Sequence, residues 1–307
     1  MILVAGSANL DFVVRASHIP GPGETVLGRD FKTYPGGKGA NQAVACARAG
    51  GASTRMLLAL GSDAYASALE ASLRDAGVAM HVVRSADLAT GTAFICVSDD
   101  AENAITVAPG ANHVLRDEHL PDLSGCSHLL MQLETPLDAV LAYASKARAR
   151  GVRVVLNAAP AQALARDILD KIDVLVVNEG ELAAIAGHPG SISESLKAVD
   201  VPTVVVTLGS RGCCARHGTD YLLQPAFPVA PVDTTGAGDT FCGVLVAALD
   251  QGLQLAQAMR LASAAGALCC TLPGAQSSIP SHARVLEFIE LHPATSATDA
   301  LRSYCGL

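Results

Sequence analysis

The sequence predicts a three-layer α/β/α sandwich with a mostly parallel central sheet and, beside it, a small β-sheet lid. Three observations carry this prediction. Short β-rich runs alternate with helical patterns along most of the chain. These runs are continuously apolar, as strands are when helices cover both faces of a parallel sheet. Two segments break the alternation, and they fit a separate small sheet better than a strand–helix unit.

The predicted strands of the central sheet are spaced so that a helix fits between most of them. They cover residues 2–7, 54–61, 128–133, 153–159, 174–178 and 203–209. Helical patterns run through residues 38–50 and 63–76. A third helix is predicted with Thr135 as its N-cap, Pro136 in its first turn and Gly151 at its C-terminal end.

The two exceptional segments carry turn signals instead of a strand–helix pattern. Residues 11–36 contain a Pro-Gly-Pro-Gly run, and residues 91–108 are two apolar stretches around an Asp-Asp-Ala-Glu-Asn turn. We expect a single domain over residues 1–307, with a lid formed by about residues 11–36 and 89–109 inserted in the α/β core. A small sheet beside such a core is suited to cover a site at the strand ends.

Composition argues against several classes of protein. The chain has 307 residues, 50% hydrophobic and 16% charged, which is ample apolar material for a large core. Its formal net charge of -8 argues against a nucleic-acid partner. No basic region of a signal peptide is found, and no apolar run approaches the roughly 18 residues of a membrane span. Nine cysteines without a Cys-x-x-Cys spacing fit a reducing cytoplasm.

The strongest chemical signal lies in Gly236-Ala237-Gly238-Asp239, directly before an apolar helical pattern. Free N–H groups at a helix start form an anion site, and glycine lets a phosphate approach the backbone closely. The same helix start stabilises a carboxylate, which makes Asp239 a weak base. A weak base suits phosphoryl transfer to an alcohol, because little proton abstraction is needed before the leaving group departs. The alternative interpretation is an ordinary N-cap.

A second glycine-rich helix start covers residues 36–42, Gly-Gly-Lys-Gly-Ala-Asn-Gln. It lacks the spacing of a P-loop and no Ser or Thr follows the lysine. Close backbone approach together with Lys38 and Asn41 suits a polyhydroxy ligand. A solvated lysine at a helix start is the alternative.

Polar residues also follow two predicted strands. Asn9 and Asp11 come just after the first strand, and Glu134 directly follows the strand at 128–133. Short polar side chains at the carboxyl ends of parallel strands can chelate neighbouring hydroxyls. An Asx turn is the alternative for Asn9 and Asp11.

Two further strand ends suit a nucleotide. The turn Asn178-Glu179-Gly180-Glu181 is rich in oxygen atoms and fits Mg²⁺ held largely through water. The turn at 207–212, Thr-Leu-Gly-Ser-Arg-Gly, suits phosphate or nucleotide. The alternatives are a helix start with acids in its first turn and a β-turn that leads into a hairpin.

Together these segments resemble the ribokinase, or PfkB, family of carbohydrate kinases. The resemblance spans nearly the whole chain, and its most specific parts are GGKGANQAVA and DTTGAGDTF. The segments that carry it occur in one order: GSANLD (6–11), PGET (22–25), GGKGANQAVA (36–45), MQLETPL (131–137), NAAPA (157–161), NEGE (178–181), TLGSRG (207–212) and DTTGAGDTF (233–241).

The resemblance implies ATP-dependent phosphorylation of D-ribose at its 5-hydroxyl, with Asp239 as catalytic base. The anion hole would be Gly236, Ala237 and Gly238. The sugar would be held, besides Asp239, by Asn9, Asp11, Gly37, Lys38, Gly39, Asn41 and Glu134. The nucleotide would be held by Asn178, Thr207, Gly209, Ser210, Arg211, Gly212, Gly238 and Ser263.

The resemblance also implies two cations and a second subunit. Glu181 would organise Mg²⁺ through water. An activating K⁺ would be bound by Asp233, Thr235, Cys269, Leu272, Gly274 and Ser278, with backbone carbonyls near Cys269 and Leu272. The partners implied are D-ribose and MgATP, and a homodimer formed through the lid.

Other activities of the same family remain open. They are deoxyribokinase, another sugar kinase and a nucleoside kinase; a non-catalytic sugar-binding protein with this fold is a further alternative. A nucleoside kinase needs aromatic side chains in the lid to stack on a base. The candidates for that role are Phe12, Phe31, Tyr34 and Phe94. Ser263 stands where the family usually has a larger polar residue near the adenine.

Overall fold

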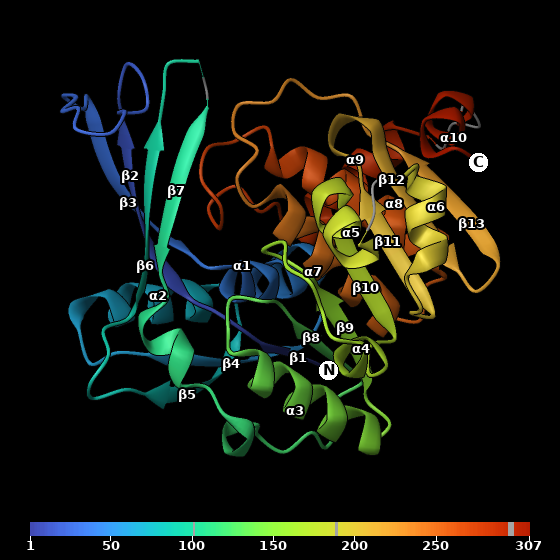
Figure 1. The fold of residues 1–307 in the computed structure, drawn as a ribbon, viewed down its shortest axis with the longest axis horizontal. Coiled ribbons are helices and arrows are strands. Elements are labelled where there is room, and N and C mark those ends of the chain that lie inside the picture. The colour runs from blue at the N-terminus through green and yellow to red at the C-terminus, as the bar shows by residue number, and fades with distance from the viewer. Residues whose placement is uncertain (101, 188–189, 294–297) are drawn as a thin grey trace.

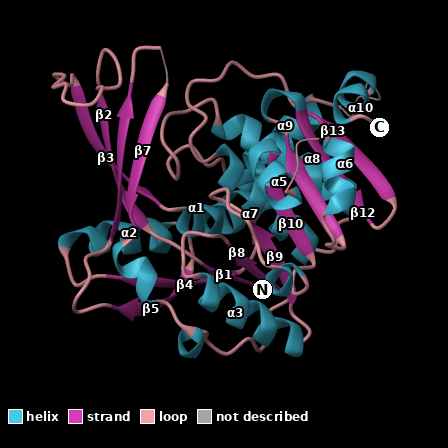
Figure 2. Ribbon diagram, in the orientation of Figure 1, coloured by secondary structure: helices cyan, strands magenta, loops and turns pink. Residues whose placement is uncertain are grey.

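The computed structural model describes the whole chain except residues 101, 188–189 and 294–297. The described residues form two separate sheets (Figures 1 and 2). Among them, the large sheet has nine strands in the order β13-β12-β11-β10-β9-β8-β1-β4-β5. Their bounds are β1 Ile2–Ala5, β4 Thr54–Leu60, β5 Ala79–Arg84, β8 His128–Met131, β9 Arg153–Asn157, β10 Val174–Asn178, β11 Thr203–Thr207, β12 Gly212–His217 and β13 Asp220–Pro225.

The large sheet is parallel from β5 to β11, and β12 and β13 extend it as an antiparallel hairpin. The continuous apolar runs predict β1, β4, β8, β9, β10 and β11, and the structure confirms each of them. They do not predict β5, which lies at the edge of the sheet. Its side chains alternate between exposed and half-buried, so it carries no continuous apolar run.

Helices cover both faces of the large sheet, which confirms the three-layer sandwich. Successive strand residues point to opposite faces, and accordingly Ile2 and Leu3 belong to different buried clusters. The Ile2 cluster is covered by α1 Lys38–Val44, α2 Ala64–Asp75, α7 Ala237–Asp250, α8 Leu255–Cys269 and α9 His282–Leu291. The Leu3 cluster is covered by α3 Leu137–Ala149, α4 Arg166–Leu169, α5 Glu179–Ala186, α6 Ile192–Ala198 and α10 Asp299–Cys305. No helix among the described residues is long and apolar enough to cross a membrane.

Short irregular helices complete the chain. The predicted helix at 38–50 is α1 followed by a π-helical turn, η1 Ala45–Ala49. Turns of 3₁₀-helix are η2 Gly110–Val114, η3 Asp117–His119 and η4 Gly209–Arg211. The prediction of Thr135 as the N-cap of the third helix is wrong. The cap of α3 is Pro136, whose carbonyl accepts from the N–H groups of Ala139 and Val140, so the helix begins at Leu137.

The small sheet has the order β3-β2-β6-β7 and stands beside the large sheet (Figure 1). Its strands are β2 Asn9–Arg15, β3 Asp30–Gly36, β6 Gly91–Val97 and β7 Asn103–Ala108. They fall in the two segments that break the strand–helix alternation, except that β2 begins two residues earlier, at Asn9. Adjacent residues of a strand point to opposite faces, so Asp11 and Phe12 lie on different faces of this sheet. Phe12 stacks on Phe31 and Phe94, with ring centroids 6.1 and 5.4 Å apart.

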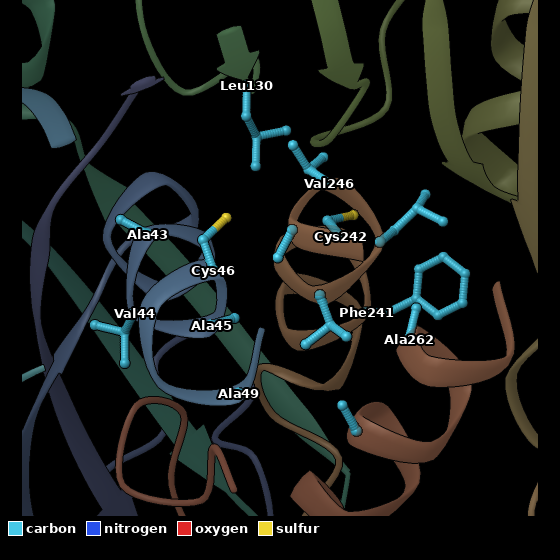
Figure 3. Packing of buried hydrophobic residues seen from close by; sticks show 14 of the residues in the cluster. Ala43, Val44, Ala45, Cys46, Ala49, Leu130, Phe241, Cys242, Val246 and Ala262 are labelled. Atoms are coloured by element: carbon cyan, nitrogen blue, oxygen red, sulfur yellow. The ribbon is translucent and has the colours of Figure 1, made fainter. Parts of the chain in front are cut away.

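Helices α1 and α7 are in close contact at the centre of the molecule, as Figure 3 shows for η1 and α7. Small residues permit this contact. A Cβ atom added to Gly243 of α7 would lie 2.6 Å from both Cβ of Ala45 and the carbonyl oxygen of Gln42. The thiol of Cys46 also donates to the Gly243 carbonyl, at 3.3 Å. The polar residues at the start of α1 are therefore fixed against the first turn of α7.

Candidate active site

The residues predicted to form a site come together at the carboxyl ends of the parallel strands. Asn9 begins β2 directly beyond β1, Asn178 ends β10, and Asp239 lies in the first turn of α7. One cleft is lined jointly by Lys38, Asn178, Glu181 and Asp239. This is the edge at which open parallel sheets bind ligands, because the loops and helix N-termini of successive strand–helix units meet there.

Asp239 is buried, with 9% of its surface exposed, and both its oxygens accept hydrogen bonds from α1. The amide of Asn41 donates to Oδ2 and that of Gln42 donates to Oδ1, each at 2.9 Å. Gly236, the N-cap of α7, has a φ of 76°, which is the left-handed region that glycine adopts without strain. Above Gly238 the space is open, since a Cβ added there would meet no heavy atom within 4 Å. A phosphate can therefore approach the N–H groups of this helix start.

A polar ledge, formed by Asn9 and Asp11 of the small sheet, lies near Asp239. Glycines make room for its side chains: a Cβ at Gly36 would lie 2.1 Å from the carboxylate of Asp11, and a Cβ at Gly91 would lie 2.2 Å from Oδ1 of Asn9. Asn112 donates to the same Asn9 oxygen at 2.8 Å and so fixes its orientation.

The start of α1 packs closely on the backbone that follows β1. This close approach explains why the motif has glycine at positions 37 and 39. A Cβ at Gly37 would lie 2.7 Å from Cα of Ala8, and a Cβ at Gly39 would lie 2.6 Å from the Gly6 carbonyl carbon. Glu134 joins the two segments, because its Oε2 accepts from the backbone N–H of Lys38 at 3.1 Å and from the hydroxyl of Ser7. Its other carboxylate oxygen remains available to a ligand.

Burial and like charges set the electrostatics of the site. Burial, and then the neighbouring carboxylates Glu134 and Asp239, raise the pKa of Asp11 to about 7. Burial works against the charge of Lys38, but Asp239, Glu134 and Glu181 outweigh it and raise its pKa. Burial likewise raises the pKa of Glu181, with Asp239 adding to the effect. The site thus gathers several carboxylates around one ammonium group.

Beyond Gly238 a larger, mostly apolar pocket of about 400 Å³ continues the cleft, within the range of small-molecule sites. Its walls include Phe227, Val229 and Phe241 as well as Ser263. The predicted nucleotide-binding residues that line it are Thr207, Gly209, Ser210, Gly212, Gly238 and Ser263. Asn178 lines the neighbouring cleft instead.

Arg211 is placed differently from the other predicted nucleotide-binding residues. It does not line either pocket, and its guanidinium lies 4.2 Å from the ring centroid of Tyr304 on α10. The Tyr304 hydroxyl donates to Glu179 at 2.7 Å. Arg211 thus stabilises the packing of the C-terminal helix beside the nucleotide turn.

The residues proposed for Mg²⁺ form a capping box. The N–H of Asn178 donates to Oε2 of Glu181, and the N–H of Glu181 donates to Oδ1 of Asn178, both at 2.8 Å. The helix-start interpretation of this turn is therefore correct. Glu181 nevertheless lines the cleft, and its second carboxylate oxygen is an oxygen ligand of the kind that Mg²⁺ prefers.

The six residues predicted to hold K⁺ lie in two adjoining segments, one before α7 and one that begins at Cys269, the last residue of α8. Asp233 joins them, because its carboxylate accepts from the N–H groups of Thr235 and Gly274, each at 2.9 Å. Burial opposes the charge of Asp233, but these hydrogen bonds outweigh it and lower its pKa. The thiol of Cys269 lies 3.0 Å from the hydroxyl of Ser278 and 3.7 Å from the carbonyl of Thr235. Leu272 is exposed and contributes its backbone only.

These donors fit K⁺ better than a tightly bound divalent metal. The loop offers one carboxylate with carbonyl and hydroxyl oxygens. No cluster of three His, Cys, Asp or Glu side chains suited to a metal ion is found in the described part of the chain.

Sequence reasoning missed the residues that hold the site together. Gln42, Asn157, Ser7 and Gln132 all lie in the motifs that carry the family resemblance, but no role is predicted for them there, and Asn112 lies outside those motifs. Asn157 ends β9 and lines the cleft. Asn157 and Gln132, like Glu134, are polar residues at the carboxyl ends of apolar strands. The same pattern could therefore have identified them.

A buried carboxylate at a helix start, an open anion site and an adjoining apolar pocket together define a kinase that transfers a phosphoryl group to an alcohol. The model of the pfkB family of carbohydrate kinases matches residues 1–282, and the chain belongs to this family.

Three relatives place the chain within the family. It is 39% identical over 302 residues to the ribokinase of Haemophilus influenzae, covering 94% of this chain and 98% of that protein. It is 33% identical to the deoxyribokinase of Salmonella typhi, over 95% and 99% of the two chains. The structure of Arabidopsis thaliana ribokinase complexed with ribose and ATP has a TM-score of 0.86 and 31% identity, over 95% of this chain and 99% of that chain.

The raised pKa of Asp11 predicts a specific pH dependence of stability. Its folded pKa of about 7 exceeds the ordinary value of 3.8, so the folded chain holds the proton that the unfolded chain has lost between these values. Stability contributed by this group therefore falls as pH rises through that window. Asp11→Asn removes the ionisation, so the variant should gain stability over the wild type as pH rises, by on the order of a few kcal/mol at neutral pH.

Urea unfolding of both ligand-free proteins at several pH values between about 4 and 8 measures this gain. Asp75→Asn, at the exposed end of α2, controls for the substitution itself. A gain that stays constant or shrinks toward neutral pH would contradict the assignment.

Proposed function

We propose that this protein phosphorylates D-ribose at its 5-hydroxyl with ATP, giving ribose 5-phosphate and ADP. The observation that carries the proposal is the position of Asp239. It lies in the first turn of α7 and lines the cleft that leads to the apolar pocket, and its charge contributes to the raised pKa of Asp11 on the polar ledge. A sugar on one side and a triphosphate on the other would meet at this carboxylate.

In the proposed reaction Asp239 orients the 5-hydroxyl and accepts its proton as the oxygen bonds to the γ-phosphorus. The bond from that phosphorus to the bridging oxygen breaks, and ADP leaves. The N–H groups after Gly236 and the ammonium of Lys38 would stabilise the charge on the phosphoryl oxygens. The lid would exclude water, so that ATP is not hydrolysed.

Ribose would lie against the small sheet. Asp11 and Asn9 present a carboxylate and an amide at one edge of the site, and Asn41 and Glu134 would contact the sugar from α1 and the end of β8. The backbone at Gly37 and Gly39 would come close to the ring, and Lys38 would reach its hydroxyl oxygens. Two hydroxyls on neighbouring carbons match a carboxylate beside an amide.

The nucleotide would occupy the cleft and the apolar pocket, with adenine between Phe227, Val229 and Ser263. Mg²⁺ would be held by Glu181 through water and would neutralise phosphate charge. K⁺ would occupy the loop closed by Asp233 and would brace the glycines of the helix start from behind.

The small sheet supports a bare sugar over a nucleoside. Phe12, Phe31 and Phe94 stack on one another on the face opposite Asp11, and Tyr65 of α2 packs on the edge of Phe12 at 5.5 Å. They are turned away from the ledge and cannot stack on a base bound there. Tyr34, which pairs with Asp11 across the strands, is the one of the four candidate aromatics on the substrate side.

Deoxyribose and other sugars remain alternatives within the family, because the 2-hydroxyl is one group among several that the ledge can bind. A non-catalytic sugar-binding protein is disfavoured by the buried Asp239 beside an open anion site. A reaction that uses ATP also favours a cytoplasmic location.

We propose further that two copies associate through the small sheet. It exposes large apolar side chains in strands β3, β6 and β7, with Phe31 64%, Phe94 55% and Ile105 55% exposed. An isolated four-stranded sheet with such side chains and two unpaired edges is expected to be covered.

The substrate assignment predicts the outcome of a coupled ADP-release assay with ribose, deoxyribose, fructose and adenosine. Ribose should give the highest kcat/KM. Asp239→Asn should lower kcat by about 10²-fold or more, the lower end expected for a positioned base, while calorimetry still detects binding of ribose and ATP. Faster turnover of another alcohol would reject ribose, and near-normal turnover of the variant would reject Asp239 as the base.

The cation loop predicts that turnover is faster in K⁺ than in Na⁺ at equal ionic strength. Asp233→Ala removes the carboxylate that joins the two segments, so it should abolish most of this difference and lower kcat in K⁺ to its Na⁺ value. The control is Asp75→Ala on the exposed end of α2. Identical rates of the wild type in both salts would remove the monovalent site.

The association proposal predicts a particle of twice the 31.3 kDa chain mass by light scattering. Phe94→Glu places a charge on the exposed apolar face and should shift the mass to that of one chain. Leu286 on α9 is 43% exposed, and Leu286→Glu is the matched control, which should leave the mass unchanged. A wild type that is already a single chain at micromolar concentration contradicts the proposal.

A further inference from the structure

A chain of buried amide groups leads from the centre of the large sheet to Asp239. The Gln42 side chain is fully buried and all its hydrogen-bonding groups have partners. Its Nε2 donates to Oδ1 of Asp239 and to Oδ1 of Asn157, each at 2.9 Å. Its Oε1 accepts from Nε2 of Gln132 at 2.6 Å. None of these three amides needs to touch substrate in order to act on Asp239.

The direction of this chain is fixed at one end by the backbone. Nδ2 of Asn157 donates to the carbonyl oxygen of Val176 on β10, at 3.1 Å. A carbonyl can only accept, so the amide oxygen of Asn157 must face Gln42 and can itself only accept. Gln42 must then present its NH₂ group to both Asn157 and Asp239. Rotating the Gln42 amide by half a turn would break its bonds to both residues.

The second donor to the carboxylate, Asn41, is held less firmly. Its Nδ2 donates to Oδ2 of Asp239, but its Oδ1 is buried and has no hydrogen-bond partner among the described residues. Apart from this one bond to Asp239, no described hydrogen bond fixes the orientation of the Asn41 amide. Of the two donors, only Gln42 is locked with its NH₂ group toward the carboxylate.

Packing alone does not explain an amide at this position. The rest of the contact between α1 and α7 is made by small apolar side chains such as Ala45 and Cys46 around Gly243 (Figure 3). Replacing a whole buried polar network by apolar groups of similar shape is often nearly neutral for stability. A network that ends on the proposed base has a use that such a core would lack.

We propose that Gln42 is the positioning residue of the catalytic base, and that the locked amide of Asn157 gives it that function. Gln42 donates to Oδ1 of Asp239 and so fixes the plane of the carboxylate toward the sugar hydroxyl. The inference rests on the proposed phosphoryl transfer. In that step the hydroxyl proton passes to Asp239, the hydroxyl oxygen bonds to the γ-phosphorus, and ADP departs with the electrons of the broken bond.

The test compares Gln42→Met with Gln132→Met in the full-length protein. Both substitutions replace a fully buried glutamine by an apolar side chain of similar length. Only Gln42→Met removes a donor to Asp239. In Gln132→Met the Gln42 amide still donates to Asp239 and is still oriented by Asn157. Thermal unfolding and KM for the sugar are measured beside kcat between about pH 5 and pH 9, using the best substrate of the wild-type panel.

Gln42→Met should lower kcat at neutral pH by about tenfold or more and change KM for the sugar little. Loss of a donor to a carboxylate disfavours its ionised form, so the acid limb of kcat should move to higher pH by about one unit or more. Gln132→Met should keep its acid limb within about 0.3 units of the wild type. An unmoved limb in folded Gln42→Met, or an equal movement in Gln132→Met, overturns the proposal.

A second variant decides the question if Gln42→Met does not fold. Gln42→Glu keeps the shape of the side chain but puts a carboxyl group against Asp239, and two carboxyls in contact hold one proton to higher pH. Its acid limb should move further than that of Gln42→Met, and a wild-type profile overturns the proposal. If the wild-type protein prefers another alcohol, only the assignment of ribose as substrate is rejected. The proposal for Gln42 is then tested with that alcohol as the substrate of all variants.

Discussion

The contact between α1 and the first turn of α7 is the constraint on which the rest of the site depends. Asp239 lies at the open helix start because it belongs to the first turn of α7, and its carboxylate is held by Asn41 and Gln42 because α1 packs against that turn. The crossing distance is set by Gly243, where any side chain would collide with Ala45 and with the backbone of Gln42. A kinase of this kind needs its base placed to a fraction of an ångström, and close-packed helices provide that rigidity better than loops do.

The same constraint concentrates charge at the site. Asp11, Glu134 and Glu181 approach Asp239 because four separate elements converge on one strand edge, and Lys38 is the only one of the predicted sugar-binding residues to bring a positive charge. Burial and the repulsion among these carboxylates raise the pKa of Asp11 and of Glu181. Such a site is unfavourable for the ligand-free protein. A bound polyhydroxy ligand and a cation would relieve it, because they supply donors and positive charge where the protein supplies acceptors.

How much of this could be predicted from the sequence depended on whether the signal was local. Continuous apolar runs predicted the buried parallel strands, but the edge strand β5 has half-exposed alternating residues and gave no such run. Local capping rules suggested Thr135, whereas the geometry of the turn made Pro136 the cap. Glycine-rich helix starts and polar strand ends were local signals, and the structure brings several of the residues that they indicated into one cleft. The contact of Gln42 with Asp239 was not predictable in this way, because the two residues are 197 positions apart in the sequence and meet only through the fold.

The structural and functional interpretations of the motifs are not true alternatives. Asp233 does close a turn through the N–H of Thr235, and Glu181 does belong to a capping box. Each of these bonds uses one lone pair of a carboxylate that has about four, and it fixes the rotamer of the side chain. The remaining lone pairs then point in a defined direction at no further entropic cost when a ligand binds. A residue that caps its own helix is for this reason well suited to bind an ion, and evidence for the cap is not evidence against the site.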